Sequence, residues 1–348
     1  MIRFYLFFGL LSFFNSHNLH ACSRVFFNQH PGFMVAGRNM DWIDAMPVDL
    51  YALPRGAKRS GLTGKNTLEW ISKYGSVVTG SSVGSPDGMN EKGLAGHMLW
   101  LSASNYGKFN PEGSSLSVGA WLQFYLDNFA TVAELVEYTQ TRPFQVVTGI
   151  YDGLEATVHL AFEDKTGDSA VIEIQKGKPV IYHGKQYTVM TNDPTYDKQL
   201  RGLKRYKGFG GSRALPGTTQ AADRFVRAAY FLKNLPEPKN SREAVAEVLS
   251  VMRNVAQPFA PINLRALKTG EPHTSPTRWR TVADLSQGLY FYENSLNPGI
   301  LWVKLSEMDF SENAPIKRFA LSEDLEKVGD ISKLFTPAAM FSFMKPAL

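Results

Sequence analysis

Near both ends of the chain, apolar positions alternate with polar ones in short runs, whereas the middle carries longer runs with apolar residues every three to four positions. Alternation indicates half-buried strands, and the longer spacing indicates amphipathic helices. The pattern predicts strands at residues 23–27, 33–41, 76–81, 93–101, 156–162, 169–175, 186–191, 278–285, 288–293 and 300–305, and helices at residues 117–129, 131–141, 221–235 and 241–255. Runs of strands separated by paired helices favour a layered α+β fold over a doubly wound parallel sheet.

The first 21 residues combine a basic start with a short apolar run. Arg3 precedes an apolar stretch at residues 4–14, and residues 15–21 are polar and end in a small residue. This arrangement is typical of a cleavable secretory signal, and the run is shorter than the roughly 20 residues that a membrane-spanning helix needs. We therefore expect removal of residues 1–21, one domain at residues 22–348, no stable membrane insertion, and export to the periplasm or the medium.

Cys22 is the only cysteine of the chain, and it directly follows the expected cleavage point. Exported proteins usually pair their cysteines, but a single cysteine has no internal partner. Cleavage before Cys22 would leave its thiol on the same residue as a free α-amine. With reference pKa values of roughly 8 for the amine and 8.5 for the thiol, the amine can accept the thiol proton. Cys22 is therefore a candidate nucleophile that carries its own base.

A second interpretation of this segment makes Cys22 an anchor. Residues 19–22, Leu-His-Ala-Cys, resemble a lipoprotein box, in which the cysteine would be acylated. His20 is unusual inside such a box, and the polar residues 15–18 separate the apolar run from the cysteine. An acylated Cys22 would make the protein a lipid-anchored binding protein without catalysis.

The hairpin predicted at residues 23–41 brings two polar residues towards Cys22. If its turn centres near His30, positions whose numbers sum to about 60 face each other, so Cys22 lies near Arg38 and Asp41 lies just beyond the paired positions. Arg38 would favour the thiolate, as nearby cations do, and Asp41 would orient the amine. From the residues alone, an ordinary surface ion pair between Arg38 and Asp41, worth at most about 1 kcal/mol, explains them equally well.

Composition and charge argue against several classes of partner. The net charge of +5 is spread over 348 residues, with one denser basic stretch at residues 201–213. A solvated helix face explains this stretch better than nucleic-acid binding, because no nucleic-acid motif accompanies it. The seven histidines show no metal-ligand spacing. His97, in the predicted strand 93–101, is typical of a hydrogen-bonded core residue. We expect no metal, no cofactor and no nucleic-acid partner.

Two glycine-containing motifs suggest other chemistry but lack the necessary context. Residues 80–84, Gly-Ser-Ser-Val-Gly, match a serine-hydrolase nucleophile elbow, which must lead into a helix. Residues 85–88, Ser-Pro-Asp-Gly, predict a turn instead. Residues 208–211, Gly-Phe-Gly-Gly, lack the strand and lysine of a phosphate-binding loop. We predict that they form a flexible loop over a pocket.

Separated motifs run through most of the chain. Residues 37–41 read Gly-Arg-Asn-Met-Asp, and residues 87–94 read Asp-Gly-Met-Asn-Glu-Lys-Gly-Leu. Residues 191–197 read Thr-Asn-Asp-Pro-Thr-Tyr-Asp, and Leu-Pro-Gly at 215–217 precedes Asp-Arg-Phe-Val-Arg at 223–227. In content and order, these motifs resemble the linear amide C–N hydrolases of the N-terminal-nucleophile superfamily, which include choloylglycine (bile salt) hydrolases and penicillin V acylases.

The resemblance implies an αββα sandwich, in which helices cover both outer faces of two stacked antiparallel sheets. It implies hydrolysis of a non-peptide amide through an acyl-thioester on Cys22, with support from Arg38 and Asp41. Asn192 would donate its side-chain amide to the oxyanion, and Arg224 would brace the site. Without the resemblance, Asn192 is a turn residue and Arg224 a solvent-facing helical residue.

The resemblance also implies small-molecule N-acyl amide substrates, such as conjugated bile salts, penicillin V or acyl-homoserine lactones. The alternative is a protein that kept the fold as a binding module without catalysis. The site residues and the expected signal resemble the Gram-negative branch of the family. The stretch between Asn192 and Arg224 is shorter than in the Gram-positive enzymes, where an insertion assists tetramer assembly. Whether the chain forms a homo-oligomer is therefore open.

The chain departs from the family's pattern at Trp100. Six residues beyond Leu94, bile salt hydrolases have an asparagine and penicillin V acylases a tyrosine. An indole nitrogen can only donate a hydrogen bond, so the second oxyanion donor is either a backbone N–H near Trp100 or the indole itself. Trp42 and Trp100 are also candidates for an aromatic wall of the acyl pocket, against the alternative that they are plain core.

Overall fold

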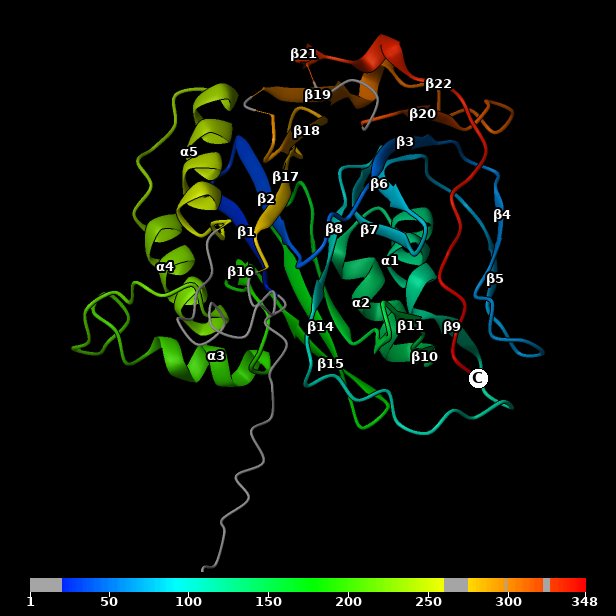
Figure 1. Cartoon of the computed structure of the whole chain (residues 1–348), viewed down its shortest axis with the longest axis horizontal. Coiled ribbons are helices and arrows are strands. Elements are labelled where there is room, and N and C mark those ends of the chain that lie inside the picture. Colours follow the sequence, from blue (N-terminus) through cyan, green and yellow to red (C-terminus); the bar gives the residue numbers. More distant parts are fainter. Residues whose placement is uncertain (1–20, 260–274, 298, 322–325) are drawn as a thin grey trace, which may run out of the picture.

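The computed structural model describes residues 21–259, 275–297, 299–321 and 326–348 of the chain. Two large sheets stack face to face (Figure 1). The seven-stranded sheet contains, in spatial order, β16 (Val189–Met190), β1 (Ala21–His30), β2 (Phe33–Asp41), β17 (Thr277–Asp284), β18 (Leu289–Asn294), β19 (Ile300–Lys304) and β21 (Gly329–Asp330). The nine-stranded sheet contains β15 (Lys178–His183), β14 (Ser169–Gln175), β13 (Val158–Glu163), β8 (Ala95–Trp100), β7 (Gly84–Asn90), β6 (Ser76–Ser81), β3 (Asp49–Leu53), β20 (Lys317–Phe319) and β22 (Thr336–Pro337).

Helices cover the outer face of each sheet (Figure 1). On the seven-stranded sheet, α4 (Ala221–Lys233) and α5 (Ser241–Asn254) pack against β1 and β2, and α3 (Tyr196–Leu203) packs beside α4. On the nine-stranded sheet, α1 (Val118–Asn128) packs against β7 and β8, and α2 (Val132–Thr141) packs against β14 and β15. This arrangement confirms the expected αββα sandwich.

Short elements complete the fold. They are the strand pairs β4 (Lys58–Ser60) with β5 (Glu69–Ile71), β9 (Ser115–Ser117) with β10 (Gln145–Val147), and β11 (Ile150–Tyr151) with β12 (Leu154–Glu155), and the 3-10 helices η1 (Leu305–Glu307) and η2 (Ser332–Leu334).

Local chemistry explains where the covering helices begin. The Ser117 hydroxyl accepts a hydrogen bond from Gly119 N, so α1 begins one residue later than predicted, with Ser117 as its N-cap. Asn240 caps α5 in the same way. The buried face of α5 meets β2 at Gly37, where a Cβ atom would lie 2.8 Å from Val248 and 2.7 Å from Met252. Only glycine lets helix and sheet approach this closely.

The N-terminal hairpin forms as predicted, but its register differs. Cys22 lies opposite Met40, not Arg38, and Asp41 pairs with Ala21 instead of lying beyond the paired positions. The cause is the turn, which lies at residues 31–32 instead of on His30 and would by itself move the pairing by three residues; an irregularity between Phe27 and His30 reduces this shift to two. Cys22 and Arg38 still share one face of the hairpin, because the shift is an even number of residues.

Two other sequence interpretations are wrong. The turn predicted at residues 85–88 is part of the fully buried strand β7, although the conclusion that no helix follows Ser81 holds. Tertiary packing decides this segment, because β7 lies between β6 and β8 under α1. The basic stretch 201–213 is not one helix face either. α3 ends at Leu203, and residues 204–213 form a connection to α4 that does not reach the pocket described below.

Candidate active site

Cys22 lies in β1, with 2% of its surface exposed. Its backbone N–H donates to Asn192 Oδ1 at 2.5 Å. Its Sγ lies 3.9 Å from Met40 Sδ and 3.9 Å from the carbonyl oxygen of Asp41. Because Asn192 is 170 residues away along the chain, only the fold brings it to Cys22.

Arg38, on β2, places a buried cation beside the thiol. Its Nη2 lies 3.9 Å from Cys22 Sγ and donates to the carbonyl oxygen of Met98 at 2.9 Å. The centre of the guanidinium lies 4.6 Å from the centre of the Trp279 ring. Held by these contacts, the guanidinium is well placed to favour a thiolate on Cys22.

Asp41 is fully buried at the end of β2 and does not bond to the Cys22 nitrogen. Its Oδ1 accepts from Thr277 Oγ1 at 2.6 Å. Its Oδ2 lies 3.8 Å from Arg224 Nη1 and has no hydrogen-bond partner among the described residues. Burial raises the pKa of this carboxyl to about 7, although Arg224 and Thr277 oppose the shift. Asp41 therefore offers one buried acceptor atom near Cys22 that a cationic donor could satisfy.

Asn192 and Arg224 meet at the backbone of Cys22. Asn192 lies in the bend between β16 and α3, and its Nδ2 donates to the carbonyl oxygen of Trp100 at 2.7 Å. Arg224, on α4, donates from Nη2 to Asn192 Oδ1 at 2.9 Å and from Nη1 to the carbonyl oxygen of Cys22. It is fully buried, so the solvent-facing position expected from the sequence alone is wrong. Arg224 therefore contacts both Cys22 and Asn192, and its role in bracing the site stays a prediction.

β8 anchors the site through alternate carbonyl groups. The carbonyl oxygen of Met98 holds Arg38, and that of Trp100 holds Asn192. Residues two apart in a strand point their carbonyl groups to the same side. One strand of the nine-stranded sheet therefore positions two candidate residues that come from separate parts of the chain.

Trp42 and Trp100 lie side by side, with ring centres 5.4 Å apart, and Tyr151 lies 5.6 Å from Trp42. All three rings line a pocket in front of Cys22. The Trp100 indole N–H donates to Ser102 Oγ at 3.2 Å. The structure thus places both tryptophans at the pocket, and the second oxyanion donor stays a prediction.

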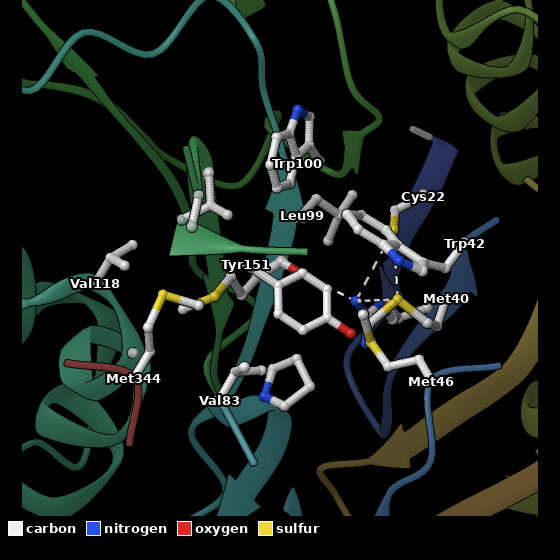
Figure 2. A pocket seen from close by; sticks show the side chains of 16 residues that line it. Cys22, Met40, Trp42, Met46, Val83, Leu99, Trp100, Val118, Tyr151 and Met344 are labelled. Carbon is white, nitrogen blue, oxygen red and sulfur yellow. Dashed lines mark hydrogen bonds between the residues drawn. The ribbon is translucent and has the colours of Figure 1, made fainter. Parts of the chain in front are cut away.

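The pocket is apolar apart from its inner end. Figure 2 shows the Cys22 thiol on one side and Val118 and Met344 on the other. Its empty volume is about 580 Å³ when the solvent at its mouth is counted. Apart from the thiol, the Arg38 guanidinium and the Tyr151 hydroxyl, the side chains that line it are apolar or indole rings. Such a pocket suits an apolar group attached to a reacting centre at Cys22.

Behind Cys22 lies a group of buried charges that sequence reasoning largely missed. We call Arg24, Arg38, Asp87, His97 and Glu163 the charge cluster. His97 Nδ1 lies 2.5 Å from Asp87 Oδ2, and His97 Nε2 lies 2.5 Å from Glu163 Oε1. Glu163 also pairs with Arg24, and Asp87 Oδ2 lies 3.9 Å from Arg38 Nη1. Asp87, His97 and Glu163 lie on three neighbouring strands of the nine-stranded sheet, and stacking of the sheets adds Arg24 and Arg38 from the other sheet.

Burial alone would lower the pKa of His97, but the carboxylates of Glu163 and Asp87 outweigh it and raise this pKa to about 9. His97 is therefore a cation at neutral pH. Its burial and its two carboxylate partners confirm the prediction of a hydrogen-bonded core residue, and its positive charge was not predicted. Burial raises the pKa of the Cys22 thiol, and Arg38 partly counteracts this effect. A reaction that used this thiol as a nucleophile would therefore need a base.

Within the described ranges, no three His, Cys, Asp or Glu residues are placed to hold a metal ion together. No helix of the described residues is long and apolar enough to cross a membrane.

Comparison with known proteins identifies relatives over nearly the whole chain. Residues 22–318 match the linear amide C–N hydrolases of the choloylglycine hydrolase family. The chain is 39% identical to the penicillin V acylase of Pectobacterium atrosepticum, over 93% of this chain and 92% of the relative. It is 25% identical to a bile salt hydrolase/transferase of Clostridium perfringens, over 87% of this chain and 98% of the relative.

The solved structure of penicillin V acylase from Agrobacterium tumefaciens superposes with a TM-score of 0.84 at 40% identity, covering 93% of this chain and 99% of that one. Both acylase-named relatives come from Gram-negative bacteria, in agreement with the expected branch. The fold, the matched motifs and these relatives lead to one assignment: the chain belongs to the choloylglycine hydrolase family of linear amide C–N hydrolases and is an amidohydrolase.

Proposed function

We propose that the protein is an exported acylase in which Cys22 becomes an N-terminal nucleophile once residues 1–21 are removed. One observation carries this proposal: the thiol lies at the inner end of the apolar pocket, and the nitrogen of the same residue is held 2.5 Å from Asn192 Oδ1. With Ala21 attached, this nitrogen is a peptide N–H. Cleavage turns it into an amine, and the unsatisfied Oδ2 of buried Asp41 is the nearby acceptor suited to orient it.

The attack uses the contacts at Cys22. The amine takes the thiol proton, and the Arg38 guanidinium, 3.9 Å away, stabilises the thiolate. The thiolate attacks the amide carbonyl carbon and forms a tetrahedral oxyanion. Asn192 Nδ2 carries two N–H groups, so it can donate to the oxyanion while it keeps its bond to Trp100.

The second half of the reaction regenerates Cys22. The protonated amine gives its proton to the leaving nitrogen, the C–N bond breaks, and an acyl-thioester remains on the thiol. Water, activated by the same amine, then hydrolyses the thioester and releases the acid. Arg224 contacts the Cys22 carbonyl oxygen and Asn192 throughout, so we assign it a positioning role.

The substrate we propose is an N-acyl amide with a mainly apolar acyl group. The pocket has few polar groups that could satisfy a buried hydroxyl of the substrate, and leaving one unsatisfied is costly. The names of the relatives suggest penicillin V and conjugated bile salts as first probes. A comparison of phenoxymethylpenicillin, glycine and taurine bile conjugates and acyl-homoserine lactones, ranked by kcat/KM, orders these possibilities.

The first experiment is the intact mass of the protein purified from an exporting cell. A mass that corresponds to residues 22–348 with a free amine supports the proposal. A mass that retains residues before Cys22 contradicts the mature form that the mechanism needs. A lipid-modified mass favours the anchored alternative.

The second experiment replaces the nucleophile. We expect Cys22→Ser to lose activity by several orders of magnitude, because an alcohol is far less acidic than a thiol and the amine would not ionise it. Electrospray mass spectrometry should detect an acyl adduct on the unsubstituted protein and none on the variant. Ser81→Ala, in the elbow-like motif, serves as the control. Full amidase activity in Cys22→Ser would refute the assignment.

A further inference from the structure

The segment at residues 338–348, which we call the C-terminal strap, runs beside α1 (Figure 1). Backbone and side-chain hydrogen bonds hold its last part in place. Met344 N donates to the carbonyl oxygen of Val83 at 3.1 Å, and the Met344 carbonyl oxygen accepts from Ser117 Oγ at 2.5 Å. Ala347 N donates to the carbonyl oxygen of Thr148 at 3.0 Å.

The surface under the strap is shaped to receive it. A Cβ atom on Gly119 would lie 2.6 Å from Met344 N, and one on Gly149 would lie 2.6 Å from the Lys345 carbonyl oxygen. A Cβ atom on Gly80 would lie 2.5 Å from the Phe341 ring. Three glycines from separate elements thus leave the space that the strap occupies. The strap is therefore a built part of the fold, and its side chains have defined positions.

One strap side chain reaches the pocket. Met344 lines the pocket, as do Val83, Val118 and Gly119. Figure 2 shows Met344 and Val118 on the side opposite the Cys22 thiol. An acyl chain whose carbonyl carbon is bonded to Cys22 would extend through apolar space towards Met344. The strap therefore faces the part of the substrate that lies farthest from the reacting bond.

We propose that the C-terminal strap, through Met344, forms the end wall of the acyl pocket and sets the longest unbranched apolar acyl chain that the enzyme accepts. This proposal rests on the proposed acylase function and adds the residue that limits acyl length. A methionine side chain is flexible and unbranched, so it closes a pocket by filling volume without imposing a fixed shape. Its removal lengthens the pocket without disturbing the strap, because the strap is held by backbone atoms at this position.

The test is a chain-length profile of kcat/KM for N-acyl amides that share one amine and differ only in acyl length. Met344→Ala removes three heavy atoms from the end wall, and we expect the optimum to move to chains longer by about two to three carbons. Each methylene newly accommodated should raise kcat/KM about fourfold, the change that burial of one methylene group produces. Met344→Trp should move the optimum to shorter chains.

Met46→Ala is the matched control, because it removes the same side chain from the same pocket near Trp42 and Met40, on the Cys22 side (Figure 2). It should change kcat/KM for all lengths to a similar extent and leave the optimum in place. Met344→Leu conserves volume and should also keep the optimum. Thermal unfolding of each variant establishes that the compared proteins are folded.

A second readout does not need amide hydrolysis. Alkyl methanethiosulfonates of increasing length label thiols: the thiolate attacks the sulfenyl sulfur, a Cys22–S–S–alkyl bond forms, and methanesulfinate leaves. We expect the labelling rate of Cys22 to show the same dependence on Met344 as kcat/KM does.

The two readouts separate the two proposals. If no amide is hydrolysed but Met344→Ala still shifts the labelling profile, the proposed acylase function is refuted, and the proposal that Met344 forms the end wall of the pocket is supported. If amides are hydrolysed, but Met344→Ala and Met344→Trp have the same optimal chain length as the unsubstituted protein in both assays, the proposal that Met344 forms the end wall is refuted. A shift in both assays supports both proposals.

Discussion

Cys22 lies on the boundary between two buried regions of opposite character. Behind it, the charge cluster holds three cations, Arg24, Arg38 and protonated His97, against two carboxylates, Asp87 and Glu163. In front of it, the pocket is almost wholly apolar. The cluster is stable because most of its charges have partners, whereas the pocket has few polar groups that need a partner.

In the proposed mechanism, this difference lets one thiol meet a stabilising cation on one side and an apolar acyl group on the other. Three cations against two anions leave one positive charge in excess, and Arg38 is the member that reaches the thiol. Electrostatic effects are stronger where water is excluded. We infer that the cluster is sensitive to the loss of any one charge, whereas the pocket tolerates substitutions that conserve volume and polarity.

The largest effect is expected when the cluster loses one carboxylate. Glu163→Gln leaves Arg24 and His97 without their shared anion. Breaking a buried pair in this way typically costs about 3–5 kcal/mol in the free energy of unfolding. Denaturant unfolding measures it. Glu307→Gln is the control: it breaks a partly exposed pair with Lys304, and we expect less than about 1 kcal/mol. An equal loss in the free energy of unfolding for the two variants would contradict the inference that the charge cluster is sensitive to the loss of one charge.

A similar effect, on catalysis instead of stability, is expected at Asn192. Asn192→Ala removes the donor proposed for the oxyanion, and loss of one such donor lowers kcat by about 10²–10³-fold. Asn192→Asp keeps the acceptor for Arg224 and for the Cys22 nitrogen but cannot donate from that atom, so it should also be impaired. Asn28→Ala, which loses hydrogen bonds to loop carbonyls far from Cys22, is the control and should keep its activity. Near-normal kcat in Asn192→Asp would refute the donor role.

The pH dependence of stability tests the charge on His97. Its pKa is about 9 in the folded protein and about 6.5 in the unfolded chain, so the folded state holds a proton between these values that the unfolded state releases. Protonation of His97 therefore contributes on the order of 3 kcal/mol to the free energy of unfolding. This contribution is complete below pH 6.5 and is lost as the pH rises towards 9.

The measurement compares denaturant unfolding of the unsubstituted protein and His97→Gln across this pH range. Because other groups titrate in both proteins, the difference between their free energies of unfolding isolates His97. That difference should shrink as the pH rises. A difference that stays constant from pH 6 to pH 9 would mean that His97 is neutral in the folded state.

The smallest effect is expected in the pocket. Met98→Leu is a volume-conserving apolar exchange, which usually costs less than about 1.5 kcal/mol. Arg38 bonds to the backbone carbonyl of Met98, so the exchange leaves the charge cluster intact. We expect kcat/KM to change by less than tenfold. A loss larger than that of Asn192→Ala would show that the pocket and the cluster do not differ in tolerance as inferred.

The contrast also explains which parts of the fold could be predicted. The amphipathic helix α5 was predicted nearly to its boundaries, because its apolar residues recur with the helical period. β7 was missed, because Pro86, Asp87 and Gly88 favour a turn locally and only packing between β6 and β8 makes them a strand. The register of the first hairpin was also wrong, since the turn lies at residues 31–32, after His30, and the pairing is irregular between Phe27 and His30.

For the site, the sequence by itself determined the chemical groups: a single thiol at Cys22, the motif residues Arg38, Asp41, Asn192 and Arg224, and through them the family. Arg38 was already placed near Cys22 by the predicted hairpin, but for the other groups tertiary structure alone decided which of them touch. It placed Asn192, not Asp41, at the Cys22 nitrogen, buried Arg224, and joined charges from both sheets behind the thiol. The physical reason is range: residue type and periodicity specify local structure and burial, whereas contacts between residues more than a hundred positions apart exist only once distant strands pair, helices pack on them and the two sheets stack.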